Sequence, residues 1–471
     1  MFSTFAIIIT LLLLMFFAYR GYSVLILAPI MAILAVLLSG DFLSSIPAYT
    51  DVFMSALSGF LLKFFPIFLL GALFGRLMAD SGAATAIANT VVEKLGASKA
   101  ILAVILVCAI LTYGGVSLFV VAFAIYPIAK DLFRAADIPK RLIPAAIALG
   151  SFTFTMTALP GTPAIQNAIP IPYYNTNVFA APILGIIGGL IMFFCGWFWL
   201  QSRAKKAHAA GEGYGQHDES DVGGVGGASV ETSLVSTHHT SFTVAMIPLV
   251  LVISLNALLT YLIFPEMDFS GLQAQFPELN IAGSLGLWSI IISLMVACAV
   301  LIILRIGHWK NLQKTINRGT YDSMLPIFNT ASEVGYGAVI ASLAGFIIIR
   351  DSILNLTPGN PLISEAVAMT TLAGITGSSS GGLSIALSTL GEDYLRMALA
   401  AGIDPELMHR VAVMAAGGLD TLPHSGAVIT LLAICGLTHK QSYLNVAMVT
   451  IVIPLIAVVA IIALGTLFGS F

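Results

Sequence analysis

The sequence contains very little charge. Only 9% of its 471 residues are Asp, Glu, Lys or Arg, and the formal net charge is −3. A soluble domain carries roughly 25% charged residues. This composition excludes an ordinary water-soluble globular protein, and we expect no nucleic-acid partner.

Cysteine is also scarce, and basic residues are missing from the very start of the chain. Each of the four cysteines, Cys108, Cys195, Cys298 and Cys435, stands alone in an apolar run. This pattern indicates no disulfide framework and no metal site, so we interpret the cysteines as packing residues and expect no cofactor. The first apolar stretch has no basic segment before it and no small-residue cleavage site after it, which favours a retained span over a signal peptide.

Long apolar segments are abundant instead. Hydrophobic residues make up 58% of the chain and the mean hydropathy is +0.99. A run of about 18 or more apolar residues can cross the roughly 30 Å bilayer core as a helix, so we predict an all-α polytopic membrane protein. The predicted crossings are 3–19, 22–39, 53–79, 142–170, 178–200, 243–264, 284–304, 322–349, 407–437 and 444–468.

Matching landmarks in the two halves predict an internal repeat. The pairs Pro66/Pro326, Gly115/Gly382, Pro139/Pro405 and Pro160/Pro423 occur in the same order and are separated by 260 to 267 residues. A constant spacing of this kind is the sequence signature of repeated architecture. We predict a first repeat over 1–200 and a second over 242–471. The segment 201–241, rich in Gly, Ser, His and acids, is predicted to be a flexible cytoplasmic linker.

Two Gly- and Ser-rich stretches interrupt apolar sequence, "TYGGVS" at 112–117 and "TGSSSGG" at 376–382. Non-helical backbone at membrane depth must be buried in protein or line a cavity. We therefore predict re-entrant hairpins over 99–134 and 362–397, whose tips meet near the midplane. The crossings 142–170 and 407–437 are predicted to be helices broken by "LPGTP" and "LPHSG".

The distribution of basic residues predicts the orientation. With the N-terminus outside, sixteen of the twenty Lys and Arg residues fall inside, Lys63 lies within a span, and Arg350, Arg396 and Arg410 fall outside. This is a strong positive-inside bias. Five crossings and one hairpin per half make the repeats inverted, with both termini exterior. Inverted repeats with broken helices are typical of secondary transporters.

Two blocks carry a family resemblance. Residues 114–170 are similar to the core motif of the gluconate permease family, and residues 418–443 resemble its second motif. The likeness extends over most of the chain outside the linker. It implies an elevator-type homodimer in a bacterial inner membrane that imports gluconate, related hydroxy acids or, in one branch, 3-hydroxybutyrate.

Small polar residues at the breaks are the candidate substrate ligands. A carboxylate needs donors and positive potential, which helix N-termini supply through free N–H groups and the helix dipole. An alternative interpretation is that these small residues allow close helix packing. The candidates are Gly114, Gly115, Ser117, Thr162, Ser378, Ser379, Ser380, His424 and Ser425.

Three ionisable residues are the candidates for ion coupling: Glu333, Asp420 and His424. The equivalent positions in the first repeat carry no titratable residues. Burying an ionisable group inside a membrane is costly in free energy. The alternative for Glu333 and Asp420 is a structural hydrogen bond. The resemblance points to proton symport, whereas Asp420 beside unwound carbonyl groups is equally suited to a Na⁺ site.

The sequence predicts a symporter for a small organic anion, with 3-hydroxybutyrate-like monocarboxylates first and gluconate-like sugar acids second. The residues at the breaks are mainly Ser, Thr and Gly, whereas five sugar hydroxyls would call for more amides and charges. Two other classes remain open, an anion channel and an intramembrane hydrolase. Asp420, His424 and Ser425 have the residue types of a triad, but their adjacency argues against a triad, whose members usually come from separate elements.

Overall fold

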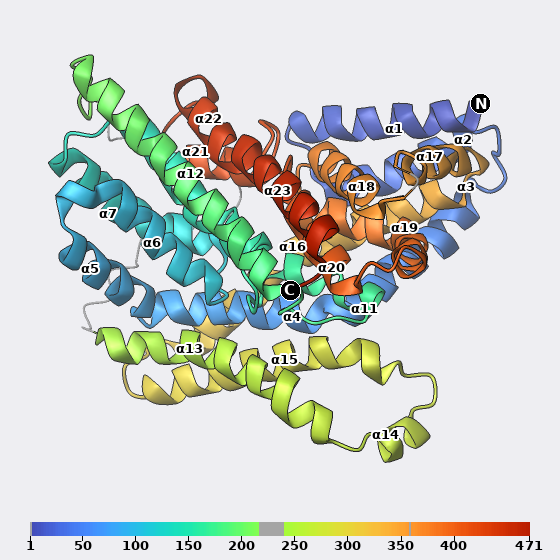
Figure 1. Cartoon of the computed structure of the whole chain (residues 1–471), viewed down its shortest axis with the longest axis horizontal. Helices are drawn as coiled ribbons and strands as arrows, with labels where there is room; N and C mark the ends of the chain where they lie inside the picture. The colour runs from blue at the N-terminus through green and yellow to red at the C-terminus, as the bar shows by residue number, and fades with distance from the viewer. Residues whose placement is uncertain (1, 216–239, 358) are drawn as a thin grey trace.

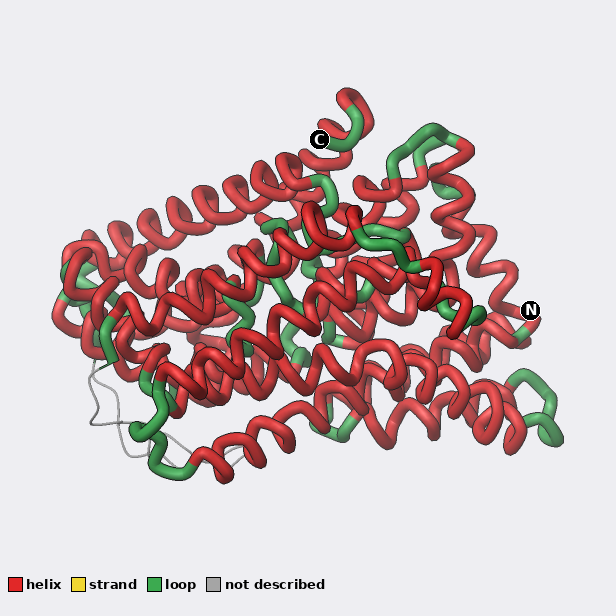
Figure 2. Tube along the Cα trace, turned by 90° about the horizontal axis from the view of Figure 1, so that it is seen from below, coloured by secondary structure: helices red, strands yellow, loops and turns green. Residues whose placement is uncertain are grey.

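The computed structural model describes residues 2–215, 240–357 and 359–471 of the protein. These residues form helices and loops and contain no strand (Figures 1 and 2). The prediction of an all-α protein is therefore confirmed. The first half contains α1 (Phe2–Tyr19), α2 (Val24–Leu38), α3 (Ser45–Pro47), α4 (Met54–Asp80), α5 (Ala83–Leu95), α6 (Ala100–Tyr113), α7 (Leu118–Ala135), α8 (Ile143–Ser151), α9 (Phe154–Thr157), α10 (Ile165–Ala168), α11 (Ile171–Tyr174) and α12 (Pro182–Ala209).

The second half contains the remaining helices. They are α13 (Phe242–Leu258), α14 (Ser270–Gln275), α15 (Ile281–Leu304), α16 (Leu312–Ser342), α17 (Ala344–Leu354), α18 (Pro361–Thr376), α19 (Ser379–Ala400), α20 (Pro405–Ala416), α21 (Gly426–Ile434), α22 (His439–Ala447) and α23 (Ile453–Phe468). The most extensive helix packing is between α4 and α16. The internal repeat and the inverted relation between the halves stay predictions.

Length and composition identify fewer uninterrupted spans than the ten predicted crossings. In the described residues, five helical segments are long and apolar enough to cross a membrane, or seven if each of two bent helix pairs counts as one span. Two predicted crossings, 142–170 and 407–437, are instead series of short helices, as their Pro- and Gly-rich breaks indicated. The helices α1, α2 and α18 are apolar but shorter.

One predicted crossing, 322–349, is broken in the structure. The helices α16 and α17 meet at 99°, because Leu343 takes an extended conformation with φ −80° and ψ 137°. The bend places Gly345 on the first turn of α1, where its N–H donates to Ser3 Oγ at 3.1 Å. A side chain at Gly345 would lie 2.3 Å from the Thr4 nitrogen, so only glycine fits this contact.

The two predicted hairpins correspond to α6–α7 and α18–α19. The turn after α6 contains Gly115 with φ +99°, and the turn after α18 contains Gly377 with φ +65°. L-residues with side chains rarely adopt such angles, so the glycines explain why both helices stop there. In Figure 1 the α6–α7 pair lies toward the left end of the molecule and α18–α19 toward the right end.

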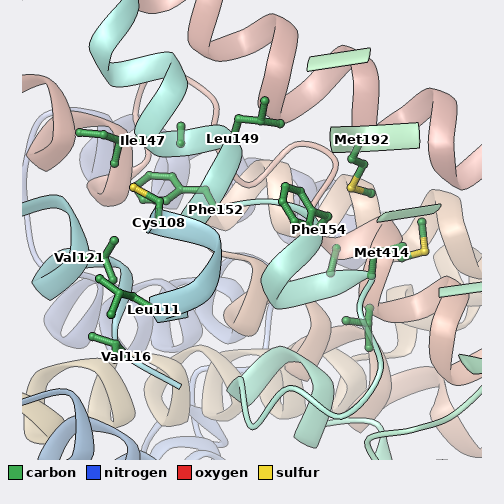
Figure 3. Close-up of a cluster of buried hydrophobic side chains, with 14 of the residues drawn as sticks. Cys108, Leu111, Val116, Val121, Ile147, Leu149, Phe152, Phe154, Met192 and Met414 are labelled. Atoms are coloured by element: carbon green, nitrogen blue, oxygen red, sulfur yellow. The ribbon is translucent and has the colours of Figure 1, made fainter. Parts of the chain in front are cut away.

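A continuous apolar core surrounds the first hairpin. Figure 3 shows part of it, with Cys108 of α6 beside Phe152 and Leu111 of α6 near Val121 of α7. The prediction that the cysteines are packing residues is right for Cys108, Cys298 and Cys435, which are buried, and wrong for Cys195, which is exposed. Cys195 lies on a face of α12 that also exposes Phe194 and Phe198.

The start of the predicted linker is ordered rather than flexible. The helix α12 continues to Ala209, and Arg141 donates two hydrogen bonds to the Glu212 carboxylate, at 2.6 and 2.8 Å. These bonds hold the pKa of Glu212 below its usual value. The next residues cover the loop after the first hairpin, because Tyr214 N–H donates to Asp137 Oδ1 at 2.9 Å. The rest of the predicted linker, 216–239, lies outside the described residues.

The orientation can be tested by cysteine labelling. Asp268, before α14, and Ala210, after α12, are both exposed. In Figure 1, α14 and the C-terminal end of α12 lie toward opposite ends of the molecule. The positive-inside bias predicts that Ala210 is cytoplasmic. In a background without the native cysteines, an impermeant maleimide added to intact cells should label Asp268→Cys but not Ala210→Cys until the membrane is opened. The reverse pattern would contradict the predicted orientation.

Candidate functional site

Three predicted ligand residues lie directly before helix starts. Ser117, Ser378 and Ser425 are the N-cap residues of α7, α19 and α21. The first N–H groups of a helix have no intrahelical acceptor, so each start presents donors and a positive dipole end. A fourth predicted ligand residue, Thr162, lies just before the short helix α10, where its hydroxyl accepts a hydrogen bond from Ala164 N–H at 3.3 Å.

The tip of the second hairpin brings several predicted residues together. The Ser379 hydroxyl accepts a hydrogen bond from Gln166 Nε2 at 3.0 Å, and Asp420 faces the same serine side chain. The Ser378 and Ser380 hydroxyls are 3.3 Å apart, and Ser378 Oγ accepts from Gly381 N–H at 3.1 Å. The tip is therefore joined both to the break in the second repeat and to α10 of the first.

Glu333 lies directly against this tip. It is 3% exposed, and a Cβ added to Gly381 would lie only 1.6 Å from its Oε2 atom. That oxygen is buried and has no hydrogen-bond partner. The carboxylate of α16 therefore occupies the space beside the first turn of α19 that a side chain at Gly381 would fill.

His424 and Ser425 pack against the turn that ends α18. A Cβ added to Gly377 would lie 3.1 Å from His424 Nε2 and 3.3 Å from Ser425 Cα. The imidazole also faces the backbone of Gly374 and Ile375. Its Nε2 atom is buried without a partner, so the ring is held from one side and retains one free polar atom.

Predicted residues of the first hairpin form a second group. The Tyr113 hydroxyl donates to the Pro160 carbonyl oxygen at 2.7 Å, which joins this tip to the break in the first repeat. A Cβ at Gly115 would lie 2.9 Å from Pro163 Cγ, and one at Gly114 only 2.1 Å from Leu249 Cδ2. Both glycines therefore also serve close packing, the alternative that the sequence left open.

The helix α10 connects the two groups, and sequence reasoning did not assign it a role. Gln166 binds Ser379 of the second tip, while Asn167 Nδ2 donates to the Thr162 and Val178 carbonyl oxygens at 3.2 and 2.8 Å. Two adjacent amides directly after "PGTPAI" were the available signal. Their partners lie elsewhere in the fold and could not be read from spacing.

Charge counting predicts Arg410 on the exterior side, and the structure shows that its side chain is buried within the protein. It is 0% exposed, because α20 packs against the connection between α11 and α12. Its Nε and Nη2 atoms donate to the Ala180 carbonyl oxygen at 3.0 and 2.8 Å, and Nη1 donates to the Thr157 carbonyl oxygen and Asn167 Oδ1, both at 3.2 Å. No carboxylate of the described residues lies within salt-bridge distance, so a positive charge is buried behind the first break.

The atoms left without partners around the second tip are mainly acceptors. Buried oxygens of Asp420, Glu333, Gln166 and Asn329 have no hydrogen-bond partner among the described residues. Gln166 and Asp420 adjoin Ser379, and Asn329 is one helical turn before Glu333. Uncompensated buried acceptors are costly, which makes this region suited to a proton or another small cation.

These features define a class of protein: a helical membrane transporter with discontinuous helices at its centre. The sequence model of GntP family permeases matches residues 1–356, and the chain belongs to that family. The uncharacterized transporter YxjC of Bacillus subtilis is 46% identical over 474 residues, covering 98% of each chain. An uncharacterized transporter of Haemophilus influenzae is 35% identical over 125 residues, covering 26% of this chain and 29% of its own.

A solved structure of Neisseria gonorrhoeae MtrF, described as illuminating a class of antimetabolite efflux pumps, has a similar fold. Its TM-score is 0.53 at 15% identity, over 92% of this chain and 85% of that one. At this identity the likeness concerns the fold alone. Since the family and the relatives are transporters, the intramembrane hydrolase alternative is excluded and the chain is not an enzyme.

Proposed function

We propose that this permease is a secondary active symporter that imports a small hydroxy-monocarboxylate together with protons. The main observation that supports this proposal is the arrangement of residues at the second hairpin tip. There, the first turn of α19, at the positive end of the helix dipole, adjoins Glu333 and Asp420, two carboxylates with unpartnered buried oxygens. An anion site beside groups that can bind a cation is what coupled import of an anion requires.

Residues near the tips support a small, partly apolar substrate. Besides the two carboxylates, the polar side chains that adjoin the second tip are hydroxyls, one imidazole and one amide, from Ser379, Ser380, Thr330, His424 and Gln166. We rank 3-hydroxybutyrate-like monocarboxylates first and gluconate-like sugar acids second. Arg410 adds positive potential from behind the first break, but its donors are engaged by carbonyl groups, so it does not contact the substrate.

Coupling to a cation is required energetically. Moving one negative charge into a cell with a negative interior costs about 2.3 kcal/mol per 100 mV. Glu333, Asp420 and His424 are the proposed coupling residues, with protons as the first choice and Na⁺ at Asp420 as the second. We further propose inverted repeats, an elevator motion and a homodimer in a bacterial inner membrane.

Uptake into liposomes tests this function. Purified protein should accumulate radiolabelled 3-hydroxybutyrate in Na⁺-free buffer when an inward proton gradient is imposed, and Glu333→Gln or His424→Ala should abolish accumulation because each removes a titratable group at the tip. A thermal-shift screen of short hydroxy acids and gluconate would rank substrates. Uptake that requires Na⁺ and ignores the pH gradient would overturn proton coupling and favour Asp420 as an ion ligand.

The same liposomes separate a carrier from a channel. A carrier exchanges internal for external substrate with saturable counterflow, whereas a channel gives conductance. We expect counterflow and no single-channel current.

A further inference from the structure

A further buried carboxylate lies in the second hairpin, away from the tip. Glu365 of α18 is 0% exposed. The Tyr174 hydroxyl of α11 donates a hydrogen bond to its Oε1 atom, and its Oε2 atom is buried without a partner. Charge counting and motif spacing give no reason to single out this residue, which is only the fourth residue of the predicted second hairpin.

No positive charge compensates Glu365 among the described residues. The nearest titratable side chain on α19 is Tyr394, which is also 0% exposed. On α20, Glu406 accepts from Ala181 N–H, His409 contacts Thr176 and Asn167, and Arg410 binds carbonyl groups.

The other elements around α18 and α11 also provide no positive charge that compensates Glu365. Arg350 and Asp351 of α17 form an exposed ion pair with each other, and Asp393 and Arg396 of α19 likewise pair with each other. The Lys63 ammonium of α4 lies over the Tyr173 ring, 5.7 Å from its centre. The helices α1 and α23, which also contact α18, contain no charged residues.

An uncompensated carboxylate in such surroundings is stable only when neutral or when it binds a cation. The neutral acid has one O–H group, and Oε2 is the atom that Tyr174 leaves free to carry it. The arrangement therefore has one fixed donor and one vacant proton position.

The hydrogen bond between Tyr174 and Glu365 also connects α11 to the second hairpin, which moves in the proposed transport mechanism. The segment α10–α11 is bonded to the second hairpin at two points, through Gln166 to Ser379 at the tip and through Tyr174 to Glu365 on the first limb. A change of charge at Glu365 would alter the attachment of that limb while leaving the tip contact in place.

We propose that Glu365 is a second proton-carrying site, distinct from the carboxylates at the tip. It takes up a proton on Oε2 from the side where the substrate enters and releases the same proton on the other side after the hairpin has moved. This inference rests on the proposed proton symport. It assigns one of the coupled protons to the limb of the hairpin rather than to the substrate site.

Two variants separate this role from a structural hydrogen bond. Glu365→Gln keeps an acceptor oxygen for Tyr174 but cannot carry a proton, whereas Tyr174→Phe removes the donor and keeps the carboxyl group. We expect Glu365→Gln to retain substrate counterflow and to lose accumulation driven by a pH gradient, by about tenfold for each pH unit imposed, because one coupled proton contributes a factor of ten per unit. Tyr174→Phe should exchange more slowly but remain coupled.

The opposite pattern would overturn the proposal. If Glu365→Gln accumulates substrate as the wild type does and Tyr174→Phe is the damaged variant, Glu365 is only a hydrogen-bond acceptor. If Glu365→Gln loses both counterflow and substrate binding, Glu365 has a structural role. That result would also overturn the proposal. Failure of the proposed symport looks different, because the wild type itself would then ignore the pH gradient.

Discussion

Replacing Gly381 with alanine should reduce transport at least about tenfold while the protein still inserts into the membrane. The added methyl group would lie 1.6 Å from Glu333 Oε2, so the carboxylate or the first turn of α19 must move. Overpacking of this kind costs typically about 1–3 kcal/mol, which corresponds to roughly a 5- to 150-fold change in an equilibrium. Since both displaced groups belong to the proposed site, we expect initial uptake to fall at least about tenfold.

Gly426 provides a matched control. It is the first residue of α21, as Gly381 belongs to the first turn of α19, but a Cβ added to Gly426 would touch nothing within 4 Å. Gly426→Ala should therefore transport at close to the wild-type rate. Initial uptake in liposomes and the elution profile of each purified variant decide between the outcomes. Normal uptake by Gly381→Ala would remove Glu333 and this turn from the site.

The local features of the two hairpins could be predicted from the sequence, because their causes are local. Glycine allows a positive φ at residues 115 and 377, and a serine before a helix start is a common N-cap. These rules need only a few neighbouring residues. The same is true of the broken segment over α8–α11, where proline and glycine interrupt an apolar run.

The partners across the fold could not be predicted. Gln166 and Ser379 are 213 positions apart, and Tyr174 and Glu365 are 191 apart. The spacing of the predicted repeat pairs equivalent positions of the two halves, whereas these two hydrogen bonds join positions that are not equivalent. Hydropathy was equally uninformative for Arg410, because one charge in an apolar helix can lie at its end or be satisfied internally by carbonyl groups.

Replacing Arg410 with leucine should cause the largest loss of stability. The substitution leaves the Ala180 and Thr157 carbonyl oxygens without the guanidinium donors that bind them at 2.8 to 3.2 Å. Each buried acceptor that is left without a hydrogen-bond partner costs about 1–3 kcal/mol. We expect a clear fall in the thermal unfolding temperature in detergent, together with a loss of folded protein.

Two further substitutions give this experiment its controls. Arg410→Lys keeps the charge but replaces the planar fork by a single ammonium, which cannot reach the same set of carbonyl groups, so its stability should lie between those of the wild type and Arg410→Leu. Arg396→Leu removes an arginine whose side chain is 76% exposed and pairs with Asp393, and exposed pairs contribute little. If Arg410→Leu unfolds at the wild-type temperature, the carbonyl contacts do not stabilise the break. The buried charge would then have to be explained by direct contact with the transported anion, which transport kinetics of Arg410→Lys would reveal as a change in KM.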